Sequence, residues 1–199
     1  MGRRLRQGWL AMVALLLGGC VVQSLQPFYT AEIVAPSPVP DGQWQLLNDD
    51  GSPKGPQPWV FSPGKVLSYD EEGRPGTLQL HFFQVAGQTY VDAIADEPAM
   101  EPNGWWLMHL AAVHTASRVE VDGERLTITP MDYEWMERAI TAGTLKLPYY
   151  RESNAEFFVF TATPSAWVAF LDAHGGDATL FAPKYALRFA RVAVPPSGR

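Results

Sequence analysis

The chain has 199 residues, of which 47% are hydrophobic, 12% aromatic and 18% charged. This size and apolar content predict one globular domain with short appendages, and they exclude a disordered chain. The 15 Lys and Arg against 21 Asp and Glu give a formal net charge of −6. A chain of this charge lacks the excess of basic residues that binds the phosphates of nucleic acids, so no nucleic-acid partner is expected.

The N-terminal segment has the features of a cleaved export signal. Arg3, Arg4 and Arg6 form a basic start, an apolar run from Trp9 to Leu17 follows, and small residues come next. The apolar run is shorter than the roughly 20 residues that a membrane-spanning helix needs. We therefore predict that residues 1–19 are removed on export.

The single cysteine of the chain stands directly after this segment. Leu17-Gly18-Gly19-Cys20 resembles the bacterial lipobox, whose cysteine receives a diacylglycerol on its sulfur before cleavage. The resemblance implies that Cys20 is lipidated and acylated, which would hold the protein on a membrane. The plainer alternative is an ordinary signal peptide with a chance cysteine. An Asp directly after the cysteine would resemble a retention signal for the inner membrane. Val21 stands there instead, which favours the outer membrane and its periplasmic face.

Residues 20–41 are predicted to form a lipidated cysteine and a proline-rich tether, because Pro36, Pro38 and Pro40 disfavour pairing with other strands. A single domain is expected over 42–194, with a frayed tail at 195–199.

The tether also carries a more specific string. Cys20-x-x-Gln23-Ser24-Leu25-Gln26-Pro27-Phe28-Tyr29-Thr30, followed by Gly42-Gln43-Trp44, resembles the opening of a family of small bacterial lipoproteins with no assigned activity. The resemblance supports localisation in the bacterial cell envelope and implies no catalytic residue.

Short apolar runs separated by turn residues predict an antiparallel sheet. Asp122-Gly123 suits a two-residue hairpin turn, which would pair Glu120 with Arg125 and Val119 with Leu126. The expected strands are 42–47, 59–62, 66–69, 78–85, 89–94, 107–121, 125–129 and 185–194.

Two helices are expected between these strands. Asp132 can cap the first, which ends near Gly143, and Thr163-Pro164 is a typical start for the second. The apolar faces are predicted to carry Trp135, Met136, Ala139 and Ile140 in the first helix and Trp167, Phe170 and Leu171 in the second.

The first strand contains a motif with a known structural role. Gly42-x-Trp44 resembles the lipocalin signature, in which the tryptophan closes the floor of a barrel and an arginine of the last strand packs across it. Arg188 or Arg191 would supply that arginine. The expected fold class is mainly β with two helices (α+β), with either a curved antiparallel sheet or a lipocalin-like barrel. Helices within the strand order speak against the strict lipocalin topology.

No catalytic constellation is evident in the sequence. The four histidines lack the close spacing of metal ligands, and neither a G-x-S-x-G motif nor a Gly-rich phosphate loop is present. No metal and no cofactor are therefore predicted. His81 and Asp92 would lie opposite each other if Ala86-Gly87 is a two-residue turn, and a solvated cross-strand pair explains them better than an acid–base site.

The expected function is that of a lipid-anchored, periplasm-facing lipoprotein without enzymatic activity. In the leading hypothesis its barrel binds an apolar or amphipathic envelope molecule. The residues expected to line the barrel are aromatic: Trp44, Trp59, Phe82 and Tyr90.

Two other functions stay open. An assembly accessory would dock on another envelope protein through Trp105 and Trp106, which follow the turn residues Pro102-Asn103-Gly104. A hydrolase is a remote third possibility, because its catalytic residues would have to be assembled from scattered positions.

Overall fold

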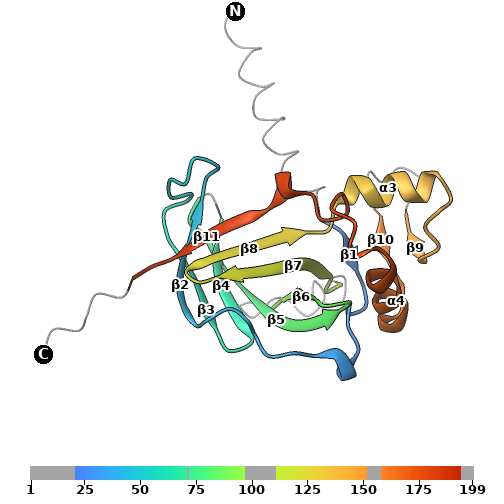
Figure 1. Cartoon of the computed structure of the whole chain (residues 1–199), viewed down its shortest axis with the longest axis horizontal. Coiled ribbons are helices and arrows are strands. Elements are labelled where there is room, and N and C mark those ends of the chain that lie inside the picture. The colour runs from blue at the N-terminus through green and yellow to red at the C-terminus, as the bar shows by residue number, and fades with distance from the viewer. Residues whose placement is uncertain (1–20, 71, 97–110, 152–157, 194–199) are drawn as a thin grey trace, which may run out of the picture.

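The computed structural model describes residues 21–70, 72–96, 111–151 and 158–193. Within these ranges the chain forms a closed eight-stranded antiparallel β-barrel, with helices and short extra strands at one side (Figure 1). The barrel strands are β2 (Gly42–Leu47), β3 (Trp59–Ser62), β4 (Lys65–Tyr69), β5 (Pro75–Val85), β6 (Gln88–Ala95), β7 (His114–Asp122), β8 (Arg125–Pro130) and β11 (Leu187–Arg191). The other elements are β1 (Gln23–Ser24), β9 (Tyr149–Tyr150), β10 (Val159–Phe160), the helices α3 (Tyr133–Thr141) and α4 (Pro164–His174), and the 3₁₀ turns η1 (Ala31–Ile33) and η2 (Pro183–Tyr185).

The barrel is an up-and-down ring. Each of its strands pairs antiparallel with the barrel strands before and after it along the chain, and β11 closes the ring against β2. The helices lie between β8 and β11 in the sequence and leave this order unchanged. The predicted fold class, mainly β with two helices and a lipocalin-like barrel, is confirmed.

Tight turns join three of the strand pairs. Ala86 and Gly87 have φ of 50° and 75°, as both central residues of a type I′ turn require. They place His81 opposite Asp92, as expected from a two-residue turn. Gly64 has φ of 69° between β3 and β4, where a side chain would strain the backbone.

The β7–β8 hairpin differs from its predicted register. The turn residues are Gly123 and Glu124, so Leu126 lies opposite Val121 and not Val119. Gly123 has φ of 58°, and glycine is preferred at the first central position of a type II′ turn. Because the shift is by two residues, the inward and outward faces are those that the sequence predicted.

Two strands are shorter than predicted. β7 begins at His114, and the expected start at 107 lies outside the described residues. β11 covers Leu187–Arg191, because Pro183 begins a 3₁₀ turn where the strand was expected to start.

The segment expected to be a tether is part of the folded domain. Val22 and Phe28 are fully buried and Val39 is 4% exposed. β1 pairs antiparallel with β7 and parallel with β10. The prolines keep the chain extended without keeping it away from the core, so the folded domain includes residues 21–41 and does not start at Gly42.

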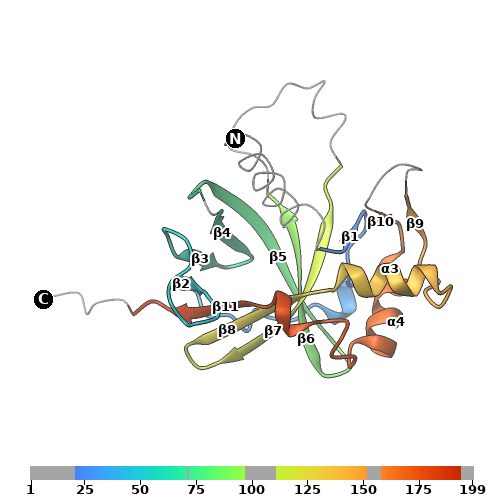
Figure 2. The same cartoon turned by 90° about the horizontal axis from the view of Figure 1, so that it is seen from above.

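Two hydrophobic cores lie on opposite sides of the barrel wall. The inner core occupies the barrel and contains Val39, Trp44, Phe61, Val66, Leu80, Phe82, Val91, Val119, Leu126 and Phe189. The outer core lies between the outer face of the wall, the N-terminal segment and the two helices, which Figure 2 shows together at one side of the barrel. Its largest members are Phe28, Phe83, Tyr90, Phe158, Phe160, Trp167, Phe170 and Phe181.

The helices are capped as predicted. The Asp132 side chain accepts a hydrogen bond from the Trp135 amide, and the Thr163 side chain accepts one from the Ala166 amide. α4 buries Trp167, Phe170 and Leu171 against the outer core. Gly175 ends it at a crowded point, because a Cβ there would collide with the Tyr90 hydroxyl and the Leu171 carbonyl.

Candidate functional site

A cavity of about 450 Å³ lies inside the barrel. Strands β3 to β6 line most of it, and β7, β8 and β11 complete the wall. Polar side chains in the lining are Thr115 and Ser117 on β7 and Lys54 in the β2–β3 connection. The apolar lining consists of Trp59, Phe61, Val66, Leu78, Leu80, Phe82, Val91, Ala93, Ile128, Pro130 and Leu187, with Val21 and Tyr185 beside them.

One end of the barrel is closed by the residues of the lipocalin-like motif. Trp44 is fully buried, and its indole Nε1 donates a hydrogen bond of 3.0 Å to the Pro40 carbonyl. The Arg191 guanidinium lies 6.0 Å from the centre of the Trp44 ring and donates a hydrogen bond to the Asp41 carbonyl. Arg191 therefore takes the position that the motif assigns to an arginine, whereas Arg188 pairs with Asp49 outside the barrel.

The other end of the cavity is bordered by longer connections and by the N-terminal segment. Val21 and Pro130 line the cavity there, as does Tyr185 of η2. A second hollow of about 230 Å³ lies next to it and shares Lys54, Tyr185 and Leu187 with the cavity. Lys184 also borders this hollow, so ammonium groups accompany the apolar lining at this end, which we call the mouth.

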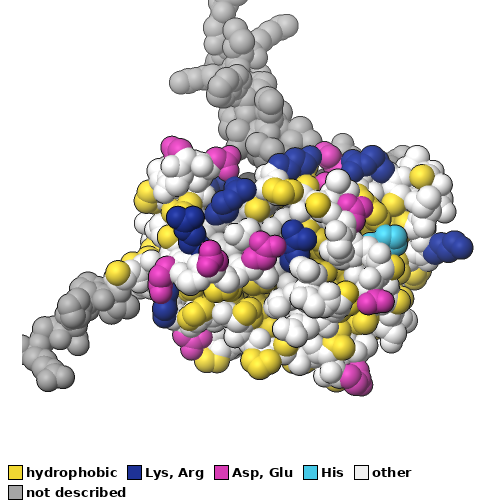
Figure 3. Space-filling view, viewed as in Figure 1, with side chains coloured by type: hydrophobic (Ala, Val, Ile, Leu, Met, Phe, Trp, Pro, Cys, Tyr) yellow, Lys and Arg dark blue, Asp and Glu magenta, His cyan; other side chains and the backbone are white. Residues whose placement is uncertain are grey.

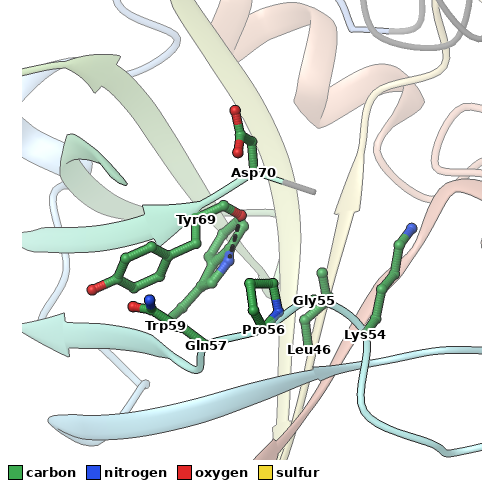
Figure 4. A pocket seen from close by; sticks show the side chains of 8 residues that line it. All are labelled: Leu46, Lys54, Gly55, Pro56, Gln57, Trp59, Tyr69 and Asp70. Atoms are coloured by element: carbon green, nitrogen blue, oxygen red, sulfur yellow. Dashed lines mark hydrogen bonds between the residues drawn. The ribbon is translucent and has the colours of Figure 1, made fainter. Parts of the chain in front are cut away.

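Trp59 is held in place at the edge of the cavity. Its indole Nε1 donates a hydrogen bond of 3.3 Å to the Tyr69 carbonyl, drawn as a dashed line in Figure 4. Figure 4 shows its ring between Tyr69 and Pro56, where a small hollow of about 30 Å³ remains. On its other side the ring lies 5.2 Å from that of Phe189. The indole is thus a rigid part of the cavity wall.

The four aromatic residues predicted to line the barrel have three different positions. Trp59 and Phe82 line the cavity. Trp44 lies in the inner core at the closed end. Tyr90 was predicted wrongly, because its side chain points out of the barrel and packs between Phe83 and Phe181.

The reason for the Tyr90 error is the alternation of side chains along a strand. Phe82 pairs with Val91, so Val91 shares its face, and Tyr90 shares the face of Phe83. The two-residue turn at Ala86-Gly87 implied this arrangement. Its register would have identified the missed lining residues Leu78, Leu80, Val91 and Ala93, all of which belong to the inner face of β5 and β6.

Cys20, Trp105 and Trp106 lie outside the described residues. Lipidation at Cys20 and partner contact through the tryptophan pair stay predictions.

A buried carboxylate lies on the outer face of the barrel wall. Asp92 is fully buried, and its Oδ1 lies 2.7 Å from Nδ1 of His114. Its Oδ2 accepts a hydrogen bond of 2.9 Å from the Phe28 amide. His81 faces Asp92 across the strand pair, as the two-residue turn implied, and its ring stacks on that of Tyr29 at 5.3 Å. The expectation that this pair is solvated was wrong, because the N-terminal segment covers Asp92 and leaves it fully buried.

This cluster connects the N-terminal segment to the barrel wall. Burial raises the pKa of Asp92, and the hydrogen bonds from His114 and Phe28 oppose that change. His114 was not predicted to contact Asp92, because the connection between β6 and β7 is too long to fix the register of the two strands. The arrangement satisfies a buried carboxylate and attaches residue 28 to β6, which is a structural role.

The described residues carry both basic and acidic side chains on the surface. On the face seen in Figure 3, basic and acidic side chains are interspersed. Ion pairs such as Lys184 with Glu134 and Arg151 with Glu137 are exposed. In the part of the chain that the structure describes, His, Cys, Asp and Glu form no cluster of three that could hold a metal ion.

In the same part of the chain, no helix has both the length and the apolar character needed to cross a membrane.

Comparisons with known protein families, with curated proteins and with solved structures find no match to this chain. The cavity and the N-terminal sequence signals are therefore the features from which a function can be inferred.

Proposed function

We propose that this protein is a lipid-anchored lipoprotein of the bacterial envelope, on the periplasmic face of the outer membrane, whose barrel binds an apolar or amphipathic envelope molecule. The observation that carries the proposal is the cavity of about 450 Å³ within the barrel. Ligand sites in proteins commonly measure about 300–1,000 Å³ and are mostly apolar with a few polar groups. The cavity matches both features.

The lining favours an acyl chain or a similar apolar group as the buried part of the ligand. Leu78, Leu80, Phe82 and Val91 offer aliphatic and aromatic contacts, and burial of apolar ligand surface against them is favourable by about 25 cal/mol per Å². Lys54 at the mouth can meet an acidic or polar headgroup. This combination suits an amphipathic molecule.

The proposed cleavage is compatible with the folded domain. Among the residues that the structure describes, the two cores are built from residues between Val22 and Phe189, and cleavage before Cys20 would leave these residues in the chain. The signal peptide and the lipobox-like Leu17-Gly18-Gly19-Cys20 support export and lipidation.

The binding proposal is tested with residues 21–199 and a dansyl-labelled fatty acid. Dansyl fluorescence is expected to rise on transfer into the cavity and to saturate at about one probe per protein. Ala93→Trp places an indole in the cavity and is expected to weaken binding at least tenfold, which corresponds to about 1.4 kcal/mol. Glu120→Trp adds the same indole on the exposed outer face of β7 and serves as the matched control.

Equal binding by both tryptophan variants would contradict a site inside the barrel, and absence of saturable binding by the unmodified domain would contradict the function itself. The anchor has a separate test, in which bacteria expressing the full chain are grown with labelled palmitate. Cys20→Ala is expected to abolish incorporation of the label. Undiminished labelling of Cys20→Ala would exclude lipidation at this residue.

A further inference from the structure

The inner wall of the barrel continues beyond its mouth. β7 carries Thr115, which lines the cavity, and Thr115 lies opposite Gln23 of β1. Gln23 lies opposite Val159 of β10, and Val159 opposite Tyr150 of β9. Because residues directly opposite each other in a sheet share a face, these side chains extend the inner face of the barrel sideways. Figures 1 and 2 both show β9 and β10 beside β1 at this side of the barrel.

This extension exposes apolar side chains. Val21 and Leu25 lie two residues before and after Gln23, so the alternation of the chain places them on the same face. Val21 is 39% exposed, Leu25 42% and Tyr150 65%. We call Val21, Leu25, Val159 and Tyr150 the apolar apron. Val21 belongs both to the apron and to the lining of the cavity, so the two surfaces are continuous.

The chain that carries the apron is firmly attached. Val21 bridges to Asp132, and the Leu25 amide donates a hydrogen bond of 2.9 Å to the Phe160 carbonyl. The buried Ser24 hydroxyl accepts a hydrogen bond from the Trp167 indole, and the Phe28 amide donates to Asp92. These contacts hold Val21 at the mouth.

The attachment decides how far the barrel lies from a lipid on Cys20. A free spacer over residues 21–41 would reach several tens of ångströms at about 3.3 Å per residue. Here the chain is attached to the domain from Val21 onward, so residues 21–41 provide no flexible spacer. The Cα atoms of Cys20 and Val21 are about 3.8 Å apart across one peptide bond. Acyl chains on Cys20 that enter a bilayer must therefore bring the mouth to its surface.

We propose that the barrel mouth and the apolar apron rest on the bilayer that holds the Cys20 lipid, so that an amphipathic lipid passes directly between that membrane and the cavity. This inference depends on the lipidation and the cavity binding of the proposed function. The occupant of the apron is the lipid surface, because Val21, the residue that follows the proposed anchor Cys20, belongs to the apron. Tyr150 of the apron suits contact with a bilayer surface, since its ring is apolar and its hydroxyl can contact lipid headgroups.

The orientation is tested with the lipidated full chain in vesicles of phosphatidylethanolamine and phosphatidylglycerol that carry an energy-transfer acceptor on the headgroup. A donor dye is attached through Ser52→Cys in one variant and through Glu124→Cys in the other. Ser52 lies in the β2–β3 connection near Lys54 of the mouth, and Glu124 lies in the turn beside Arg191 at the closed end. Transfer is expected to be clearly greater from position 52. Equal transfer, or greater transfer from position 124, would overturn the proposal.

A matched control lengthens the connection. An insertion of twelve Gly and Ser residues between Cys20 and Val21 keeps the anchor and the cavity and adds a flexible span of about 20 Å. The difference in transfer between the two dye positions is expected to shrink. A difference that persists undiminished would show that the short connection does not set the orientation.

The passage of lipid is tested with the dansyl-labelled fatty acid preloaded into the same vesicles. Leu25→Glu combined with Tyr150→Glu is expected to slow its uptake by the lipidated protein at least several-fold. The control Val34→Glu alters a side chain that is 51% exposed, at a residue whose backbone bridges to Phe83 of β5 away from the apron, and it is expected to leave uptake unchanged. Equal rates in all three proteins would overturn the direct route.

Binding of the free probe by residues 21–199 separates the two proposals. If these variants bind the free probe normally and yet show no difference in orientation or uptake, the function stands and the membrane-facing mouth is refuted. If the domain does not bind the free probe, the cavity function itself has failed.

Discussion

The two faces of the β5–β6 strand pair differ in what they pack against. Phe82 points inward and lines the cavity, whereas its neighbour Phe83 points outward and is fully buried beside Tyr29 and Tyr90. Both faces bury a phenylalanine, so aromatic character alone does not distinguish them. The outer face is covered by helices and the N-terminal segment, and the inner face encloses space because eight strands form a barrel wide enough to hold one small ligand.

The outer core supplies the rigidity that an open interior lacks. The rings of Phe28 and Trp167 lie 4.3 Å apart, as do those of Tyr133 and Phe158. Close aromatic pairs of this kind are worth about 0.5–1.5 kcal/mol beyond their burial. The outer core and the closed end near Trp44 thus support the barrel wall. The side chains around the cavity make fewer contacts with one another, because they border open space.

The largest expected effect compares the two neighbouring phenylalanines. Phe83→Ala is expected to lower the free energy of unfolding by about 3–5 kcal/mol, because it opens a void in a closely packed core. Phe82→Ala is expected to cost at least ~1 kcal/mol less, because its side chain already borders open space. Urea unfolding of both variants measures the difference. Equal losses would mean that the two faces are packed to the same density.

The buried carboxylate of the outer face gives the next effect. Asp92→Ala removes the acceptor of the His114 and Phe28 hydrogen bonds and is expected to lower the free energy of unfolding by about 3 kcal/mol. Limited proteolysis should then cut the N-terminal segment first, because residue 28 loses its attachment to β6. Wild-type resistance of this segment in Asp92→Ala would show that the aromatic contacts alone hold it.

A smaller effect is expected at the closed end of the barrel. Arg191→Leu removes the guanidinium beside Trp44 and its hydrogen bond to the Asp41 carbonyl. Both are partly exposed, so the expected loss is about 1 kcal/mol in thermal or urea unfolding. Binding of the dansyl-labelled fatty acid should not change, because Arg191 does not line the cavity. Loss of binding would place the ligand at the closed end.

The smallest effect is a dependence on pH. Burial raises the pKa of Asp92 above its ordinary value of 3.8, so the folded protein holds a proton that the unfolded chain has already released. The stability that this proton contributes is complete below pH 3.8 and is lost as the pH rises through the folded pKa. Wild type should therefore lose stability relative to Asp92→Asn between acidic and neutral pH. A constant difference in urea unfolding across this range would contradict the raised pKa.

Local signals in the sequence predicted much of the fold. All eight barrel strands, two of them with longer bounds than observed, both helices and both N-caps follow from alternation, turn residues and capping residues. The Gly42-x-Trp44 motif limited the arginine that closes the barrel to Arg188 or Arg191. The site was predicted in part. Trp59 and Phe82 were identified, but aromatic character favoured Tyr90 over Val91, although the register assigns Val91 to the cavity.

The sequence by itself determined the strand and helix types, the likeness to a lipoprotein signal and the turn at Ala86-Gly87, because each depends on neighbouring residues. Tertiary structure decided which apolar face encloses a cavity and which is filled. It also decided that the proline-rich segment packs on the barrel and that His114 meets Asp92. These features depend on contacts between residues far apart in the chain, such as Phe28 with Asp92 and Ser24 with Trp167, and no local pattern encodes them.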